Sequence, residues 1–375
     1  MKKTAVLLVV IIWVQIFSSA FLWAAPAVSA KSAVVIDAGT GKILYEQDAH
    51  SRRGMASTTK IMTALVALER VSPDMLVEVD PRACGVEGSS VYLFEHEKIT
   101  MEALLYSLML QSANDAAEAI AYAIAGGIEE FADMMNQKAD ELGLTATHFD
   151  NPHGLDGETH YTTAYELALI AACALENEMF AKIVSTEKKV VPLHNGEASR
   201  LLINHNRLLR EYDDIIGVKT GYTKKCGRTL VSAAEKDGVR LICVTLNDGN
   251  DWKDHRELLD YGFSLYKEVL LANDVSCEIP VCGGTKTSVF ARTHEEIFAV
   301  LPNNHGNIQA VMEIPRFLYA GITEGDVVGR VVFYADGLMI GEAALYAESS
   351  VPIVRQEKSF WKIFFSFLSG RKRES

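Results

Sequence analysis

Apolar residues recur at helical spacing over several stretches in the first half of the chain. Residues 101–111 are the clearest, with apolar side chains at positions i, i+3, i+4, i+7 and i+8: Met101, Leu104, Leu105, Leu108 and Met109. Further helices are predicted from about residue 57, over the alanine-rich stretch 116–125, and over 128–142, which Gly143 ends. Because dense alanine permits close packing, the helix over 116–125 is expected near the centre of a domain.

The alternation of apolar and polar residues predicts strands on both sides of this helical region. Residues 32–48 predict a hairpin, and 215–246 predict an antiparallel meander with a turn at Asp237-Gly238. Thr163 and Glu166 form a T-x-x-E capping box for a helix to about Leu175, and a helix over 253–266 closes the first domain. From about Cys277 only short strands follow, which predicts a separate small β-sandwich.

The two ends of the chain differ from its body. Lys2 and Lys3 precede a long apolar run and small residues, which is typical of a secretory signal peptide over 1–30. A retained membrane anchor is the alternative, and either one exports the protein. Residues 355–375 favour an amphipathic helix at an anionic membrane surface, because 358–375 carries five basic residues against Glu374, a net charge of +4. A helix docked on the protein's own core is the alternative.

Composition narrows the class of protein further. The 375 residues are enough for two domains, and 49% hydrophobic with 23% charged residues is ordinary globular composition. The net charge of −13 argues against a nucleic-acid binder. None of the six cysteines forms a C-x-x-C pair or a zinc spacing, so no metal site is expected. Cys277 and Cys282 are the closest candidates for a disulfide, and free buried thiols are the alternative.

Three short motifs carry candidate chemistry. Ser57 and Lys60 form S-x-x-K, one helical turn apart, so both side chains share a face. The positive end of the helix dipole favours an oxyanion beside Ser57, and a lysine whose pKa falls toward neutrality can act as its base. An N-cap serine with a solvated lysine is the alternative.

The second motif, S-x-N, places Ser112 and Asn114 in a break between two helices, where both can project into one cleft. A pair of helix-capping residues is the alternative. The third, K-T-G, begins at Lys219 in a strand-like run, and its Gly221 permits a substrate backbone to approach the strand. A strand end with a turn glycine is the alternative.

S-x-x-K, S-x-N and K-T-G in this order, on an exported chain, match the signature of penicillin-binding proteins and class A β-lactamases. With GSSVYL, LLYSLMLQSANDAAEAIA, NPHGLD, YTTAYELALIA and GVKTGYT, the sequence from about Lys31 to Tyr266 resembles the low-molecular-mass penicillin-binding proteins that are serine-type D-alanyl-D-alanine carboxypeptidases, of the peptidase family S11 type. The membrane-bound, sporulation-associated enzymes of Gram-positive bacteria are similar in architecture.

The resemblance implies a fold and a domain layout. The expected class is an α+β domain like that of serine β-lactamases and DD-peptidases, an antiparallel sheet flanked by helices, followed by a small all-β sandwich. The expected boundaries are a signal peptide over 1–30, a catalytic domain over 31–275, a β-sandwich over 276–354 and a membrane-anchor helix over 355–375.

It also implies roles for single residues. Ser57 forms the acyl-enzyme, Lys60 accepts its proton, and Ser112 relays a proton. The substrate-binding residues are Asn114, Lys219, Thr220, Gly221 and Tyr222, with Thr220 at the D-alanine carboxylate and the N–H groups of Ser57 and Tyr222 as the oxyanion hole. An arginine is expected to assist at the carboxylate, and the sequence leaves Arg228 and Arg256 open. The middle triplet is S-A-N rather than S-D-N.

The implied activity is removal of the terminal D-alanine from peptidoglycan stem pentapeptides, with β-lactams as inhibitors and no cofactor. The implied location is the outer face of the cytoplasmic membrane. The alternatives are a D,D-endopeptidase, a serine β-lactamase and a non-catalytic wall-binding module of the same fold. A lactamase is disfavoured because Glu158 sits in no E-x-x-L-N pattern. The irregular spacing of His148, His153 and His160 favours structural histidines over a metal site.

Overall fold

The computed structural model describes residues 25–192 and 198–354, and it divides the chain into one unit up to Leu265 and a second from Tyr266. This boundary comes ten residues before the predicted one at 275/276. The reason is that β10 (Tyr266–Ala272) pairs antiparallel with β13 (Ile297–Pro302) and therefore belongs to the second unit. The predicted tail helix over 355–375, and most of the predicted signal peptide, lie outside the described residues.

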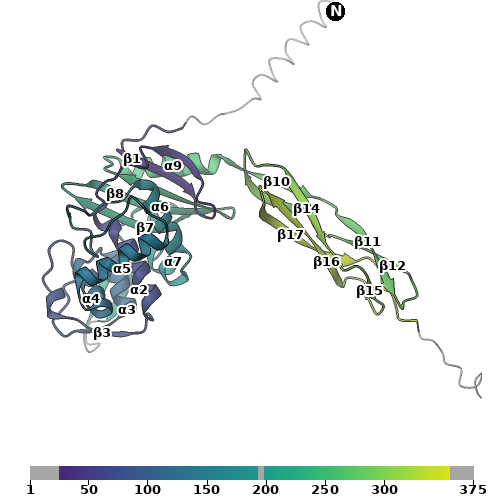
Figure 1. The fold of residues 1–375 in the computed structure, drawn as a ribbon, viewed down its shortest axis with the longest axis horizontal. Coiled ribbons are helices and arrows are strands. Elements are labelled where there is room, and N and C mark those ends of the chain that lie inside the picture. Colours follow the sequence, from purple (N-terminus) through teal and green to yellow (C-terminus); the bar gives the residue numbers. More distant parts are fainter. Residues whose placement is uncertain (1–24, 193–197, 355–375) are drawn as a thin grey trace, which may run out of the picture. The chain divides into compact units, whose positions relative to one another are not determined.

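The first unit is built on a five-stranded antiparallel sheet with the strand order β2-β1-β9-β8-β7 (Figure 1). Its strands are β1 (Ser32–Asp37), β2 (Ile43–Gln47), β7 (Ile215–Thr223), β8 (Gly227–Lys236) and β9 (Val239–Leu246). The N-terminal hairpin and the later meander thus join into one sheet, through the pairing of β1 with β9. Because β7 is an edge strand, one side of K-T-G has no neighbour in this sheet.

Side chains of the central strands alternate between two packed faces. Val34, Ile36 and Ile242 point into the large core that the helices of the unit also form. On the opposite face, α9 (Asp251–Ser264) lies close enough for an added Cβ at Gly262 to sit 3.2 Å from Val35. Both faces being covered, β1, β8 and β9 are buried over most of their length.

The helical layer matches the periodicity of the sequence closely. Its elements are η1 (Ala56–Thr59), α2 (Lys60–Arg70), η2 (Pro81–Ala83), α3 (Met101–Leu110), α4 (Asn114–Ala125), α5 (Ile128–Glu141), α6 (Ala164–Leu175), α7 (Glu178–Val184) and α8 (Leu208–Glu211). Thr163 caps α6 by accepting a hydrogen bond from the Glu166 N–H, as predicted. The Glu166 carboxylate instead accepts from the N–H groups of Thr145 and Ala146, which ties α6 to the preceding loop.

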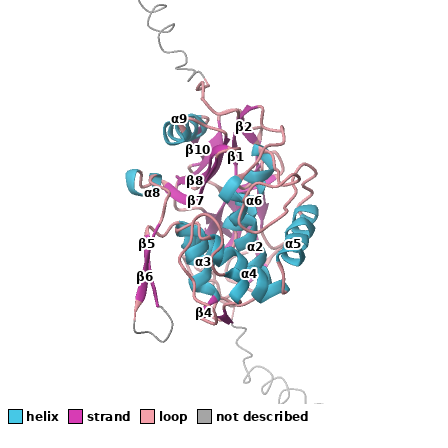
Figure 2. Ribbon diagram, turned by 90° about the vertical axis from the view of Figure 1, so that its left-hand side faces the viewer, coloured by secondary structure: helices cyan, strands magenta, loops and turns pink. Residues whose placement is uncertain are grey.

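Two small hairpins complete this unit (Figure 2). One pairs β3 (Leu76–Glu78) with β4 (Lys98–Thr100), and the other pairs β5 (Lys188–Pro192) with β6 (Ser199–Ile203). The second hairpin lies beside α3 and was not predicted from the sequence. Its strand β6 leads directly into residues 204–206.

The folded unit begins before the predicted boundary at residue 31. The Ser29 hydroxyl donates to Asp248 at 2.7 Å and can equally reach Asp254 at 2.9 Å. Ala30 is buried, and its carbonyl accepts a hydrogen bond from the Gln47 side chain. Cleavage after Ala30 would therefore remove the contacts of Ser29 from this unit.

The second unit is all-β, as predicted. Its six-stranded sheet has the order β14-β16-β17-β12-β11-β15, beside the two-stranded sheet β10-β13. The remaining strands are β11 (Ser276–Cys282), β12 (Ser288–Arg292), β14 (Ile308–Glu313), β15 (Leu318–Tyr319), β16 (Val327–Ala335) and β17 (Leu338–Ala347). Its small core is centred on Ile279, Ala291 and Leu345. All six cysteines of the chain are free thiols, Cys277 and Cys282 included. None of the described helices is long and apolar enough to cross a membrane.

Candidate active site

Ser57 and Lys60 meet at the start of the helical layer. Ser57 lies in η1, and Lys60 is the first residue of α2, so the short 3-10 turn and the helix hold them one turn apart. The Lys60 Nζ lies 3.1 Å from the Ser57 Oγ, within hydrogen-bond distance. The predicted pairing of hydroxyl and amine therefore holds in the structure, and the alternative of a solvated lysine does not.

Lys60 is enclosed by protein on all sides. Its side chain is 0% exposed, and its Nζ also donates to the Asn114 Oδ1 at 2.7 Å and to the His153 carbonyl at 2.5 Å. Burial lowers the pKa of Lys60 well below its usual range, and the nearby Lys219 lowers this pKa further, against an opposing effect of Asp115. A neutral amine in contact with a serine hydroxyl is the arrangement that a base requires.

Lys219 is a second buried lysine, close enough to Lys60 to affect its pKa. It lies in β7, is 2% exposed, and donates from its Nζ to the Thr220 carbonyl at 3.0 Å. Burial alone lowers the pKa of Lys219 to about 7. Burial therefore lowers the pKa of both lysines below the ordinary range of the side chain.

Gly221 explains why β7 can lie against the nucleophile. A Cβ at this position would sit 3.0 Å from the Ser57 N and would collide with the Thr229 Oγ1. Thr229 in turn donates to the Met55 carbonyl at 3.1 Å, which ties β8 to the residues just before η1. The glycine of K-T-G thus permits close contact between the strand and the turn that carries Ser57.

The S-x-N motif lies in the break between α3 and α4, as predicted. Ser112 adopts φ +58°, a conformation that non-glycine residues rarely take, and is 5% exposed. The Asn114 amide accepts from Lys60 through its oxygen and donates through its nitrogen to the Glu87 carbonyl at 2.6 Å. The amide therefore orients Lys60, and the contact with substrate that the sequence predicts for Asn114 stays a prediction.

A cleft of about 630 Å³ opens above these groups. It is lined by Ser57, Ser89, Ser112, His205, Thr220, Gly221, Tyr222, Arg228, Asp251 and Trp252. Five predicted residues line it directly, whereas Lys60, Asn114 and Lys219 are buried beneath. Ser89, His205, Asp251 and Trp252 were not predicted; Ser89 lies in GSSVYL, to which no role was given, and the other three lie in no quoted motif. A larger hollow of about 830 Å³ around Arg256 and Asp214 contains none of the motif residues, so we place the site in the smaller cleft.

The structure separates the two arginines that the sequence left open. Arg228 lines the cleft on the same side as Thr220, and its Nε donates to Asp251 at 2.9 Å. Arg256 instead pairs with Asp214 at 2.9 Å and with Asp260, outside the cleft. The guanidinium of Arg228 is therefore the one placed to meet a carboxylate beside Thr220.

The histidines of the loop before α6 act as structural groups in the described region. The carbonyl of His153 accepts from Lys60, and the His160 Nε2 lies 2.7 Å from the Thr59 hydroxyl. Burial lowers the pKa of His153, and it lowers the pKa of His160 to about 4, so both rings are neutral at pH 7. Among residues 25–192 and 198–354, no cluster of His, Cys, Asp or Glu side chains suits a metal ion.

A serine hydroxyl paired with a buried lysine, beside a second buried lysine on an antiparallel strand, defines a serine acyl-transfer site. Comparison with known proteins gives the family: a family model described as D-alanyl-D-alanine carboxypeptidase matches residues 19–250, and one described as the C-terminal domain of penicillin-binding protein 5 matches 266–352. The chain belongs to the D-alanyl-D-alanine carboxypeptidase family, which confirms the resemblance inferred from the motifs.

Individual relatives and solved structures agree. The chain is 32% identical to the D-alanyl-D-alanine carboxypeptidase DacF of Bacillus subtilis, over 86% of each chain. The crystal structure of the carboxypeptidase DacD from Francisella tularensis is similar with a TM-score of 0.62 and 28% identity, covering 88% of this chain and 95% of that one. Penicillin-binding protein 5 from Haemophilus influenzae gives the same TM-score and identity, covering 87% and 98%.

Proposed function

We propose that the protein is a serine D-alanyl-D-alanine carboxypeptidase whose acyl-enzyme forms on Ser57. The observation that carries this assignment is the 3.1 Å contact between the Ser57 hydroxyl and the amine of a fully buried lysine. The Ser57 Oγ attacks the carbonyl of the penultimate D-alanine of a stem peptide as Lys60 takes the hydroxyl proton. The peptide bond then breaks, the terminal D-alanine leaves with a proton on its amine, and water hydrolyses the ester.

The proton route follows from the surroundings of Lys60. Its amine is oriented by Asn114 and by the His153 carbonyl, so its remaining contact is the hydroxyl of Ser57. Ser112 lines the same cleft and is assigned the relay to the leaving amine. Lys219 contributes by its charge, because a nearby cation disfavours the protonated form of Lys60 and keeps it a base.

Recognition of the D-alanine carboxylate is assigned to Thr220 and Arg228. Both line the cleft, and a hydroxyl together with a guanidinium can hold a carboxylate by charge-assisted hydrogen bonds. Because Asp251 engages the Arg228 Nε, the other two guanidinium nitrogens are the ones we assign to substrate. The N–H groups of Ser57 and Tyr222 are assigned to the oxyanion that forms during attack.

The site is assigned to the outer side of the cytoplasmic membrane, where stem peptides are found. Support for export comes from the basic and apolar start of the chain, and support for membrane attachment from the basic, apolar tail. Both segments are therefore tested separately from catalysis, by fractionation of cells that express the full chain or a chain ending at residue 354.

The test measures release of free D-alanine from a stem pentapeptide, and covalent labelling by a fluorescent penicillin. We expect the wild type to show both, and Ser57→Ala to lose both by at least about 10⁴-fold, because the nucleophile is gone. Ser185→Ala, at an exposed serine of α7's C-cap, is the matched control and should behave as wild type. Labelling without release of D-alanine, with rapid loss of the label, would favour a β-lactamase. A well-folded wild type without any label would favour a wall-binding module.

A further inference from the structure

One wall of the cleft is a loop that no catalytic motif contains. We name residues 87–94 the clamped loop; its Ser89 lines the cleft. The loop is joined to the S-x-N motif by its backbone, since the Glu87 carbonyl accepts from the Asn114 Nδ2 and the Ser89 carbonyl accepts from the Asn114 N–H at 2.7 Å. Asn114 is also the residue that orients Lys60, so the position of the loop and that of the base are linked.

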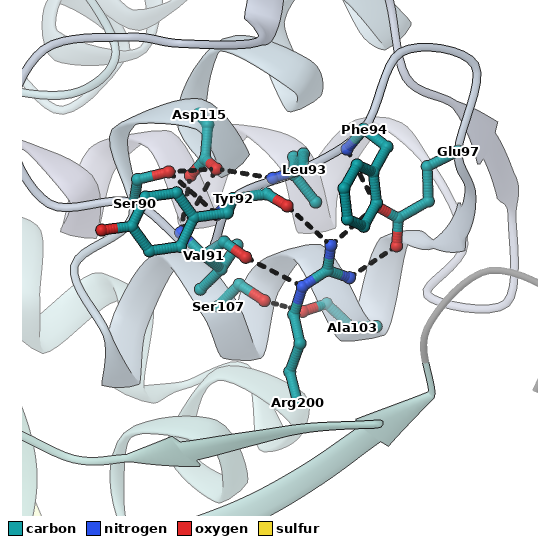
Figure 3. A network of polar contacts seen from close by, with 10 residues as sticks. All are labelled: Ser90, Val91, Tyr92, Leu93, Phe94, Glu97, Ala103, Ser107, Asp115 and Arg200. Carbon is teal, nitrogen blue, oxygen red and sulfur yellow. Dashed lines mark hydrogen bonds and ion pairs between the residues drawn. The ribbon is translucent and has the colours of Figure 1, made fainter. Parts of the chain in front are cut away.

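Asp115, the next residue of α4, holds the middle of the clamped loop. Its buried carboxylate accepts from the Ser90 hydroxyl at 2.6 Å, from the Val91 N–H at 3.2 Å and from the Leu93 N–H at 3.0 Å, as Figure 3 shows. These bonds give the buried Asp115 carboxylate its partners and hold residues 90–93 of the loop against it.

Arg200 holds the same loop from the opposite side, and it comes from β6, 103 residues after Glu97 in the sequence (Figure 3). Its guanidinium donates to the carbonyls of Val91 at 2.9 Å and Tyr92 at 3.0 Å, and forms a two-point ion pair with Glu97 at 2.5 and 2.7 Å. The Glu97 side chain is 0% exposed and also accepts from the Phe94 N–H. Only a planar group with several donors can make all these bonds at once.

The ion pair also connects a second wall of the cleft. Strand β6 ends at Ile203, and His205, two residues later, lines the cleft. The His205 N–H donates to the Leu110 carbonyl at the end of α3, which anchors this segment next to Ser112. Arg200 thus joins the wall that carries Ser89 to the wall that carries His205.

We propose that Arg200 is a positioning residue for the carboxypeptidase reaction, which fixes the spacing between the Ser89 and His205 walls and thereby the binding of the stem peptide. The inference rests on the proposed function of the cleft. Arg200 itself lines no part of the cleft, so its effect passes through the clamped loop and through β6. The exposed rings of Tyr92 and Phe94 also lie on this loop.

The test compares Arg200→Met with the double variant Glu97→Gln/Arg200→Met, which leaves no buried carboxylate without its cation. The matched control is Arg256→Met, which breaks a partly buried arginine pair outside the cleft. We expect both Arg200 variants to raise KM for the pentapeptide about 10-fold with kcat within about twofold, and Arg256→Met to leave KM unchanged. Arg200→Lys keeps the positive charge but loses the planar guanidinium with its several donors. We therefore expect its KM to lie between those of the wild type and Arg200→Met.

Amide hydrogen exchange provides a readout that does not depend on turnover. Faster exchange confined to residues 89–94 and 203–206 in the Arg200 variants is the expected result. The inference is overturned if both Arg200 variants fold and keep the wild-type KM and exchange, or if their KM changes only as much as that of Arg256→Met. A wild type that releases no D-alanine would overturn the proposed function instead, and the exchange measurement would still decide whether Arg200 orders the two walls.

Discussion

The reactive corner of the cleft and its clamped wall are built in different ways. In the corner, Ser57, Lys60 and the K-T-G strand are brought together by one helical turn and one strand, with a desolvated amine at the centre. In the clamped wall, charged groups are fully paired, and Arg200 and Glu97 meet across 103 residues of sequence. One region holds two buried lysines whose hydrogen-bond partners are uncharged oxygens, whereas the other holds its charges in an ion pair.

The two regions therefore differ in role: the corner carries the reactive groups, and the clamped wall fixes the position of the backbone. Burying an amine without a counter-ion costs stability but lowers its pKa, and the neutral amine is what a base must be. Burying an arginine in a paired network adds no reactive group but fixes backbone carbonyls in place. We therefore expect substitutions in the corner to change rates and to raise stability, and substitutions in the wall to change substrate binding.

Among the substitutions that test this comparison, we expect Lys219→Met to have the largest effect. We expect kcat/KM for D-alanine release to fall about 100-fold, because the cation that disfavours protonation of Lys60 is lost. Stability should rise by about 1–4 kcal/mol at pH 7, since a buried cation is replaced by an apolar side chain. Urea unfolding and steady-state kinetics on the same samples provide both values.

The stability gain should depend on pH with a definite sign. The pKa of Lys219 in the folded protein is about 7, below its ordinary 10.5, so the unfolded chain binds more protons between these values and wild-type stability rises with pH there. Methionine lacks this effect. The advantage of Lys219→Met should therefore be greatest at and below about pH 7 and shrink toward about pH 10; an advantage that grows with pH would show that Lys219 is not buried as a neutral amine.

Arg228→Leu tests the carboxylate end of the corner with a smaller effect. We expect KM to rise about 10-fold for a pentapeptide with a free C-terminal carboxylate, and little for the same peptide as its C-terminal amide. Arg207→Leu is the control, because Arg207 is similarly exposed and also lies over the Trp252 ring but does not line the cleft. Equal effects of Arg228→Leu on the acid and the amide would remove Arg228 from carboxylate recognition.

The sequence was sufficient for the reactive corner because its parts are local. S-x-x-K is one helical turn, and K-T-G is one strand with a glycine where a turn must approach, so the motifs locate each part, and the family resemblance they carry implies that the parts meet. The helix start at Thr163 was predicted for the same reason, since its side chain bonds to an N–H three residues later; the similar cap at Thr100 was not predicted.

What the sequence did not predict depends on distant contacts. Nothing around Arg200 or Glu97 marks either as a partner of the other, and the β5-β6 hairpin that brings them together went unrecognised. The substrate contact predicted for Asn114 stays a prediction, and its motif did not reveal that Glu87 and Lys60 are partners of its amide. The choice between Arg228 and Arg256 likewise required knowing which one Asp214 and Asp260 hold away from the cleft.

The pH dependence of acylation by a fluorescent penicillin tests the central claim, that a neutral Lys60 takes the proton of Ser57, most directly. We predict that the acylation rate constant of the wild type rises with pH along a limb whose midpoint lies well below 10.5, the ordinary pKa of lysine, as Lys60 loses its proton. In Lys60→Met this limb should vanish and the remaining rate should be lower by about 10³-fold. A limb of unchanged midpoint in Lys60→Met, or a wild-type midpoint near 10.5, would contradict the account.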